Sequence, residues 1–314
     1  MKRLALALLL LAQPVVVAAD QQRILQQATT LNAQALQASQ EGRYAEALPK
    51  AQEALALRER ALGTEHPDVA VSLNTLGWVY FQQSRYGEAE PLYQRALAIQ
   101  EKALGPDHPD VAQTLDNLVL LYFRQDRPTE AEPLARRAVA IAEKVFGPMH
   151  LRVGRAVNIL ALIYRTQGRY GEAEPLARRA LEIVESRRGA QYAGVGNVLN
   201  NLGMIHGLQG DEERAEAEAR RALVIHERAL GPDHPDVANS LWVLAFVYRK
   251  QGRYAEAEPA LRRALAIYEN PHLPPNHVRK ADVLESLAEV YRALGKVAEA
   301  DEAQARAAIL RTMR

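Results

Sequence analysis

A 42-residue period runs through almost the whole chain after its first twenty residues. The triplet Gly42-Arg43-Tyr44 has related triplets that begin at residues 84, 126, 168, 210, 252 and 295. A second marker, His66-Pro67-Asp68-Val69-Ala70, recurs at His108 and His234, with weaker copies at His150 and Tyr192. A fixed period of this length is typical of repeat proteins, in which each unit packs only against its neighbours. The 314 residues therefore need not form two globular domains.

Each repeat is predicted to contain two antiparallel helices. Each second marker begins a helix, because Pro fits the first helical position and Asp in the first turn complements the helix dipole. Apolar residues then follow at helical spacing of four, three and four, as in Val69, Leu73, Leu76 and Tyr80. A short polar turn leads into a second helix near residues 86–104. Two positions of this second helix, those of Ala89 and Ala96, hold alanine in every repeat, which lets helix backbones approach closely.

The pattern Leu73-x-x-Leu76-Gly77-x-x-Tyr80, followed by Ala89 and Tyr93, resembles the tetratricopeptide (TPR) signature. The 42-residue period and the HPDVA opening resemble the kinesin-light-chain variety of that repeat. The resemblance implies an all-α fold, a right-handed α-solenoid superhelix of about seven helix pairs, whose first helices line a concave groove. The TPR solenoid is expected over 20–314, with repeats at 21–62, 63–104, 105–146, 147–188, 189–230, 231–273 and 274–314. One residue is inserted before the seventh triplet, and we expect it within 270–276.

The first 19 residues have the features of a secretory signal peptide. Lys2 and Arg3 precede the apolar run Leu4–Ala12, and small residues end at Ala19, after which we predict cleavage. An uncleaved membrane anchor is the alternative, but the apolar run is shorter than the roughly 20 residues of a spanning helix. The mature protein is expected to be exported, periplasmic or secreted, without a membrane span.

Catalytic and metal-binding motifs are absent from the sequence. There is no cysteine, which excludes disulfides, thiol catalysis and thiolate metal sites. There is no glycine-rich phosphate loop with a lysine, no nucleophile elbow and no HExxH motif. The marker histidines occur once per repeat, so they do not converge on a metal. The formal net charge of +1 lacks the basic excess of nucleic-acid binders. We therefore expect no catalytic residues, cofactor, metal or nucleic-acid partner.

An asparagine-rich position on the first helices is predicted to face the groove. An asparagine side chain offers both a donor and an acceptor, so a row of them could hydrogen-bond the backbone of an extended peptide. The alternative is that each asparagine bonds a neighbouring helix or water. The position holds Asn32, Asn74, Asp116, Asn158, Asn200, Trp242 and Glu285.

We predict that the binding hot spot lies in repeats four to six. Gly207 replaces a side chain in a position that holds Arg165 and Arg249, which indicates a recess between two cations and favours acidic peptides. Gly194 and Gly196 in the opening of repeat five indicate a weakened helix start that lets the groove change width. The full candidate groove set is Asn74, Trp78, Arg124, Asn158, Arg165, Asn200, Met204, Gly207, Trp242, Phe246 and Arg249.

These features together predict an exported, non-catalytic TPR scaffold that binds a partner protein or extended peptide. Polar residues in the first and last repeats argue against end-to-end polymerisation, so a monomer is expected. A structural subunit of an envelope assembly without a peptide ligand is the alternative, and an enzyme is a remote one.

Overall fold

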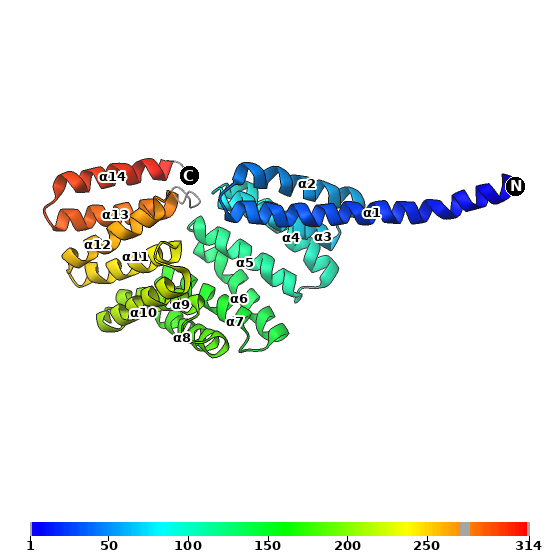
Figure 1. Cartoon of the computed structure of the whole chain (residues 1–314). Coiled ribbons are helices and arrows are strands. Elements are labelled where there is room, and N and C mark those ends of the chain that lie inside the picture. Colours follow the sequence, from blue (N-terminus) through cyan, green and yellow to red (C-terminus); the bar gives the residue numbers. More distant parts are fainter. Residues whose placement is uncertain (1, 271–276, 313–314) are drawn as a thin grey trace. The chain divides into compact units, whose positions relative to one another are not determined.

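The computed structural model describes residues 2–270 and 277–312, with side chains from residue 20 onward except at 40, 277 and 278. Within these residues every regular element is an α-helix, and the fourteen helices are labelled in Figure 1. They are α1 (Lys2–Gln40), α2 (Tyr44–Leu62), α3 (Pro67–Gln82), α4 (Tyr86–Leu104), α5 (Pro109–Arg124), α6 (Pro128–Phe146), α7 (Leu151–Thr166), α8 (Tyr170–Arg188), α9 (Ala193–Gln209), α10 (Glu212–Leu230), α11 (Pro235–Lys250), α12 (Tyr254–Tyr268), α13 (His277–Ala293) and α14 (Val297–Thr312). The prediction of an all-α repeat solenoid is confirmed.

Two regions of the sequence argument lie wholly or partly outside this description. The side chains of the predicted leader, residues 1–19, are not described, although residues 2–19 form the start of α1. Residues 271–276, most of the segment expected to hold the insertion, are also outside it. Among the described residues, no helix has both the length and the apolar character that a bilayer crossing requires.

The histidine of the second marker forms the N-terminal cap of a first helix. The Nδ1 atoms of His66, His150 and His234 accept hydrogen bonds from backbone N–H groups two residues later, at 3.1, 3.2 and 3.1 Å. The first N–H groups of a helix have no partner within the helix, so a side-chain acceptor at this place stabilises the helix start. The recurrence of histidine in the repeats therefore has a local structural cause.

The turn between the two helices of a repeat requires a left-handed backbone. Gly168 has φ of 75°, a conformation that glycine adopts without steric cost. The equivalent residue of repeat two, Ser84, adopts φ of 60°. This turn reverses the direction of the backbone, so consecutive helices pack antiparallel.

The two alanine positions of the second helices lie in the core. All fourteen alanines, seven at each position, are at most 1% exposed. The backbones of α9 and α10 lie close together at Gly203, where a Cβ atom would lie 3.2 Å from the backbone oxygen of Ala215. Small side chains at these positions allow the helices to pack at the short distances that this solenoid uses.

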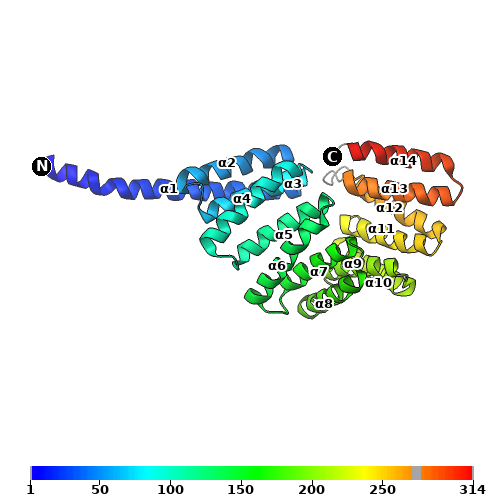
Figure 2. The ribbon, with the colours of Figure 1, turned by 180° about the vertical axis from the view of Figure 1, so that it is seen from behind.

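The protein forms two compact units, Met1–Leu121 and Tyr122–Arg314. In the first, α1 to α4 bury Ala35, Ala47, Leu76 and Val79 in one cluster. In the second, successive helices from α6 to α14 lie side by side, as Figures 1 and 2 show. The first helices α7, α9, α11 and α13 contact one another along the stack, whereas no comparable contact joins the described second helices. The first helices therefore form the inner layer of this unit.

Candidate functional site

The asparagine amides bond to the next repeat. Asn32 Nδ2 donates to Ser72 Oγ at 3.2 Å, Asn74 Nδ2 to Thr114 Oγ1 at 2.7 Å, and Asn200 Nδ2 to Ser240 Oγ at 2.9 Å. The three Oδ1 atoms are buried without a hydrogen-bond partner in the described part of the protein. The neighbouring-helix alternative describes these residues, because each amide donates one N–H to a hydroxyl group of the next repeat.

Each of these hydroxyl groups also contacts a polar residue of the preceding second helix. Arg58 donates to Ser72 Oγ at 2.9 Å, Thr114 donates to Gln100 at 2.6 Å, and His226 Nδ1 lies 2.7 Å from Ser240 Oγ. We name each set of asparagine, hydroxyl residue and second-helix polar residue a junction triad. Sequence reasoning missed the triads, although a signal was present. The equivalent hydroxyl positions in repeats four and five are Ala156 and Val198, and there the second-helix position holds Ala142 and Val184.

The junction of α7 and α9 lacks a triad and contains a pocket instead. Asn158 has no hydroxyl partner there, and its Oδ1 accepts a bond of 3.1 Å from Asn201 Nδ2. Beside it lies a pocket of about 370 Å³. Its walls include Arg152, Arg155, Asn158, Val184, Tyr192 and Val198.

The recess expected beside Gly207 is not present, so this expectation was wrong. A Cβ atom at Gly207 would lie 2.9 Å from Cε1 of Phe246, because the phenyl ring occupies the space. Met204 on the same helix is 9% exposed and belongs to the core. The glycine is therefore needed for packing between α9 and α11.

Gly196 has a packing role that the sequence analysis did not anticipate. A Cβ atom at this position would lie 2.4 Å from Nε2 of His226. The imidazole is fully buried and lies 3.0 Å from the backbone oxygen of Ala193. The absence of a side chain at Gly196 admits the ring of a junction triad, so this glycine has a packing role.

The two tryptophans of the candidate set are partly buried by neighbours. Trp242 Nε1 donates to Ser286 Oγ at 3.1 Å and so links α11 to α13. Trp78, in the first unit, stacks on Phe81 with ring centroids 5.4 Å apart. Both side chains contribute to packing between or within helices.

The candidate arginines differ in their partners. Arg249 forms an ion pair with Glu289, and burial lowers the pKa of its guanidinium. Arg165, near the end of α7, has a buried Nε without a hydrogen-bond partner, and no described carboxylate pairs with it. Burial and then the charge of Arg279 lower the pKa of Arg165 to about 10, so it remains cationic at neutral pH. Arg124 is half-buried at the end of α5.

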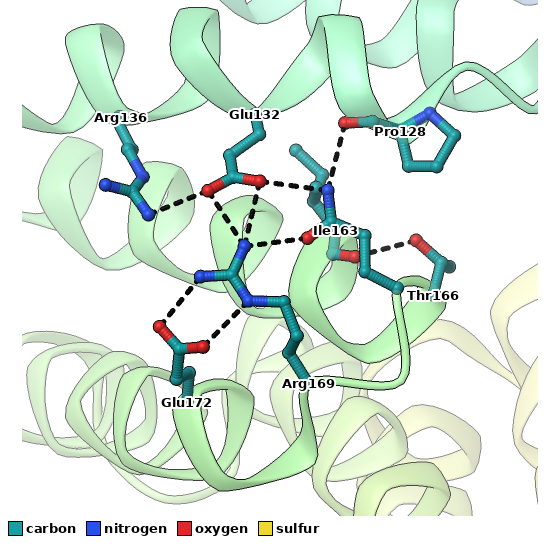
Figure 3. Close-up of polar contacts among 8 residues, drawn as sticks. Pro128, Glu132, Arg136, Ile163, Thr166, Arg169 and Glu172 are labelled. Carbon is teal, nitrogen blue, oxygen red and sulfur yellow. Dashed lines mark hydrogen bonds and ion pairs between the residues drawn. The ribbon is translucent and has the colours of Figure 1, made fainter.

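A second set of polar contacts joins the turns of adjacent repeats (Figure 3). The Arg169 guanidinium lies between Glu132, at 2.9 Å, and Glu172, at 2.7 Å, with its carbon 4.0 Å from the ring centre of Tyr164. Burial by itself would raise the pKa of Glu132, but hydrogen bonds from Gln167 and Arg169 outweigh it, so the pKa lies below its usual value. Arg253 repeats the arrangement with Glu216. These contacts connect adjacent repeats.

Repeat five replaces this arginine and tyrosine with Asp211 and His206. His206 is 2% exposed and lies between two carboxylates, 2.7 Å from Glu218 and 3.3 Å from Glu174. Burial raises the pKa of Glu218. No group of three or more histidine and acidic residues in the described part of the protein is arranged to hold a metal ion.

Stacked pairs of antiparallel helices with an inner layer of first helices define a helical-repeat scaffold. The protein belongs to the tetratricopeptide repeat family, whose model matches residues 26–102, 79–144, 110–186, 152–227 and 194–270. The TPR resemblance inferred from the sequence is thus confirmed. No curated protein sequence matches this one.

Solved structures of similar fold include kinesin-light-chain-like repeats. BtubC (BKLC) from P. vanneervenii is 24% identical, over 73% of this protein and 91% of that one, with a TM-score of 0.55. A Podosopora anserina structure described as "putative kinesin light chain nearly identical TPR-like repeats" is 25% identical, over 64% and 95%, with a TM-score of 0.54. A Rap protein complexed with competence and sporulation factor is 14% identical, over 92% and 100%, with a TM-score of 0.58.

Proposed function

We propose that this protein is an exported, non-catalytic scaffold whose first helices bind a partner protein or extended peptide. The observation that carries the proposal is Arg165, a half-buried cation whose buried Nε has no hydrogen-bond partner and which has no carboxylate partner among the described residues. Leaving a desolvated donor of a cation unpaired costs free energy, and an acidic group of a ligand would offset that cost. Arg279 on α13 is near enough to act on Arg165 of α7, which places two cations on the inner layer of the second unit.

Fold alone does not determine function, so the proposal depends on this site. The Rap structure supports it by analogy, because that protein of similar fold is complexed with a separate factor. Export is supported by the charged start, the apolar run and the small residues up to Ala19. The absence of a converging catalytic motif in the sequence supports a binding role over an enzymatic one.

The test begins with a crosslinking pull-down of the mature protein from envelope extract, followed by titration calorimetry with the partner obtained. Arg165→Ala is expected to weaken binding by about 1 kcal/mol or more, because charged anchors in desolvated sites dominate interface energies. Arg178→Ala is the matched control, because its side chain is 56% exposed on the second helix α8. Equal affinity of the wild type and Arg165→Ala, with unchanged helical signal, would exclude Arg165 from the interface.

An envelope-assembly subunit is the second candidate. It is favoured by Val297 and Ile309 of α14, which are 63% and 62% exposed on the last helix. Light scattering separates the two functions, because assembly predicts a mass that rises with concentration in the absence of any ligand.

A further inference from the structure

The pocket between α7 and α9 has an apolar base. Val184 of α8 and Val198 of α9 are 7% and 3% exposed, and they occupy positions that hold polar members of a triad at other junctions. Valines cannot supply the hydrogen bonds that close those junctions. A volume of about 370 Å³ lies within the range of small-ligand sites.

The charge around the pocket is reversed relative to repeats two, three and six. The position that holds Asp68, Asp110 and Asp236 holds Arg152 in repeat four and Gly194 in repeat five. Neither α7 nor α9 has an acidic residue in its first turn. Arg155 adds a second cation, and no lining residue is a carboxylate. The positive ends of two helix dipoles add to this potential.

Gly194 also shapes one wall of the pocket. A Cβ atom there would lie 2.6 Å from Cε1 of Tyr192, so the glycine lets the tyrosine ring lie against the start of α9. Tyr192 is 45% exposed, and its ring presents an aromatic surface beside Arg152 and Arg155. The amides of Asn158 and Asn197 are the remaining polar groups of the lining.

We infer that this pocket binds a carboxylate carried on an aromatic or branched apolar body. The arginines offer charge-assisted, bidentate hydrogen bonds to the carboxylate, and the valines and Tyr192 receive the apolar part. The ligand is either the C-terminal residue of a polypeptide or a free acid, which share this chemistry. The pocket is separate from Arg165, the residue proposed to contact the partner protein. It can be tested before that partner is identified.

The probe is N-acetyl-4-fluorophenylalanine. Its binding to the full-length protein is measured by the broadening of its fluorine NMR signal. Its C-terminal amide, which lacks the charge, is the matched probe. We expect the acid to bind at least tenfold more tightly than the amide. Equal binding of the two probes would overturn the proposal.

The protein variants use residues that other repeats carry at the same positions. Arg152→Asp introduces the residue that repeat two has at the equivalent position, Asp68. Arg155→Gln introduces the residue that repeat three has there, Gln113. Neither variant is therefore expected to unfold the protein. The double variant should lose at least tenfold in affinity for the acid, whereas Arg178→Gln on the exposed side of α8 should not change it. Unchanged binding by the folded double variant would also refute the site.

The source of the carboxylate is distinguished by a longer probe that ends in the same fluorinated residue. Tighter binding of an acetylated Ala-Ala-fluorophenylalanine acid than of the single residue indicates a polypeptide C-terminus. Binding of the single residue alone indicates a free acid. Binding of neither to the wild-type protein would exclude the pocket as a carboxylate site.

Discussion

At the scale of single residues, His226 explains two features of the sequence at once. Its Nε2 lies 3.0 Å from the Ala193 carbonyl oxygen, which can only accept, so Nε2 carries a proton and donates there, while Nδ1 lies 2.7 Å from the Ser240 hydroxyl. The same ring fills the space above Gly196. Gly196, which the sequence suggested only as part of a weakened helix start, is therefore required by a side chain 30 residues later.

The first prediction concerns this glycine. Gly196→Ala should destabilise the protein by about 1–3 kcal/mol, because the imidazole is held on both nitrogens and cannot move away from the added methyl group. Gly171→Ala is the control, since its Cβ would meet nothing within 4 Å and alanine is the better helix former. Circular dichroism melts should show a lower midpoint for the first variant and no loss for the second. Equal midpoints would mean that His226 does not occupy this space.

The second prediction concerns the pH dependence of the same triad. Burial lowers the pKa of His226, so below about pH 6.5, the ordinary histidine value, the unfolded protein binds a proton that the folded protein does not. Stability therefore falls as pH decreases from the ordinary value toward the folded pKa. His226→Gln, which copies Gln100 of another triad, should lose less stability than the wild type between pH 7.5 and 5.5. Parallel losses in melting midpoint would contradict this role.

At the scale of helices, the alanine positions control how closely neighbours pack. Ala180→Leu is expected to cost about 1–3 kcal/mol, because a fully buried alanine on α8 leaves no room for three more carbons. Repeats contact only their neighbours, so the loss should appear as a local, broadened unfolding step. Glu182→Leu introduces leucine at an exposed position of α8 and should leave the melt unchanged. An Ala180→Leu melt identical to that of the wild type would show that the helices can separate freely.

At the scale of the whole molecule, the proposed export decides where a partner is sought. The protein from its native host is predicted to begin at Asp20, after removal of residues 1–19. Intact-mass measurement on envelope and cytosolic fractions tests this directly. A full-length protein in the cytosol would contradict export. The partner would then be sought in the cytosolic fraction.

The sequence alone determined the all-α repeat fold, because the period, the helix starts and the alanine positions are local features or contacts between adjacent helices. Each second marker was predicted to begin a helix, and its histidine is the cap of that helix at His66 and His150. The TPR family followed from the same motifs. These properties depend on spacing between residues, which the sequence displays directly.

Only the tertiary structure decided which polar residues remain available for a ligand. The partner of Asn200 is Ser240, 40 residues away on the next first helix, and Phe246 closes the recess beside Gly207. Both outcomes depend on the rotation and distance between repeats, which residue spacing does not specify. The same geometry leaves Arg165 without an acidic partner among the described residues and leaves a pocket where two valines replace a triad. The candidate site therefore followed from how one repeat is placed on the next, because its contacts are between repeats and not within them.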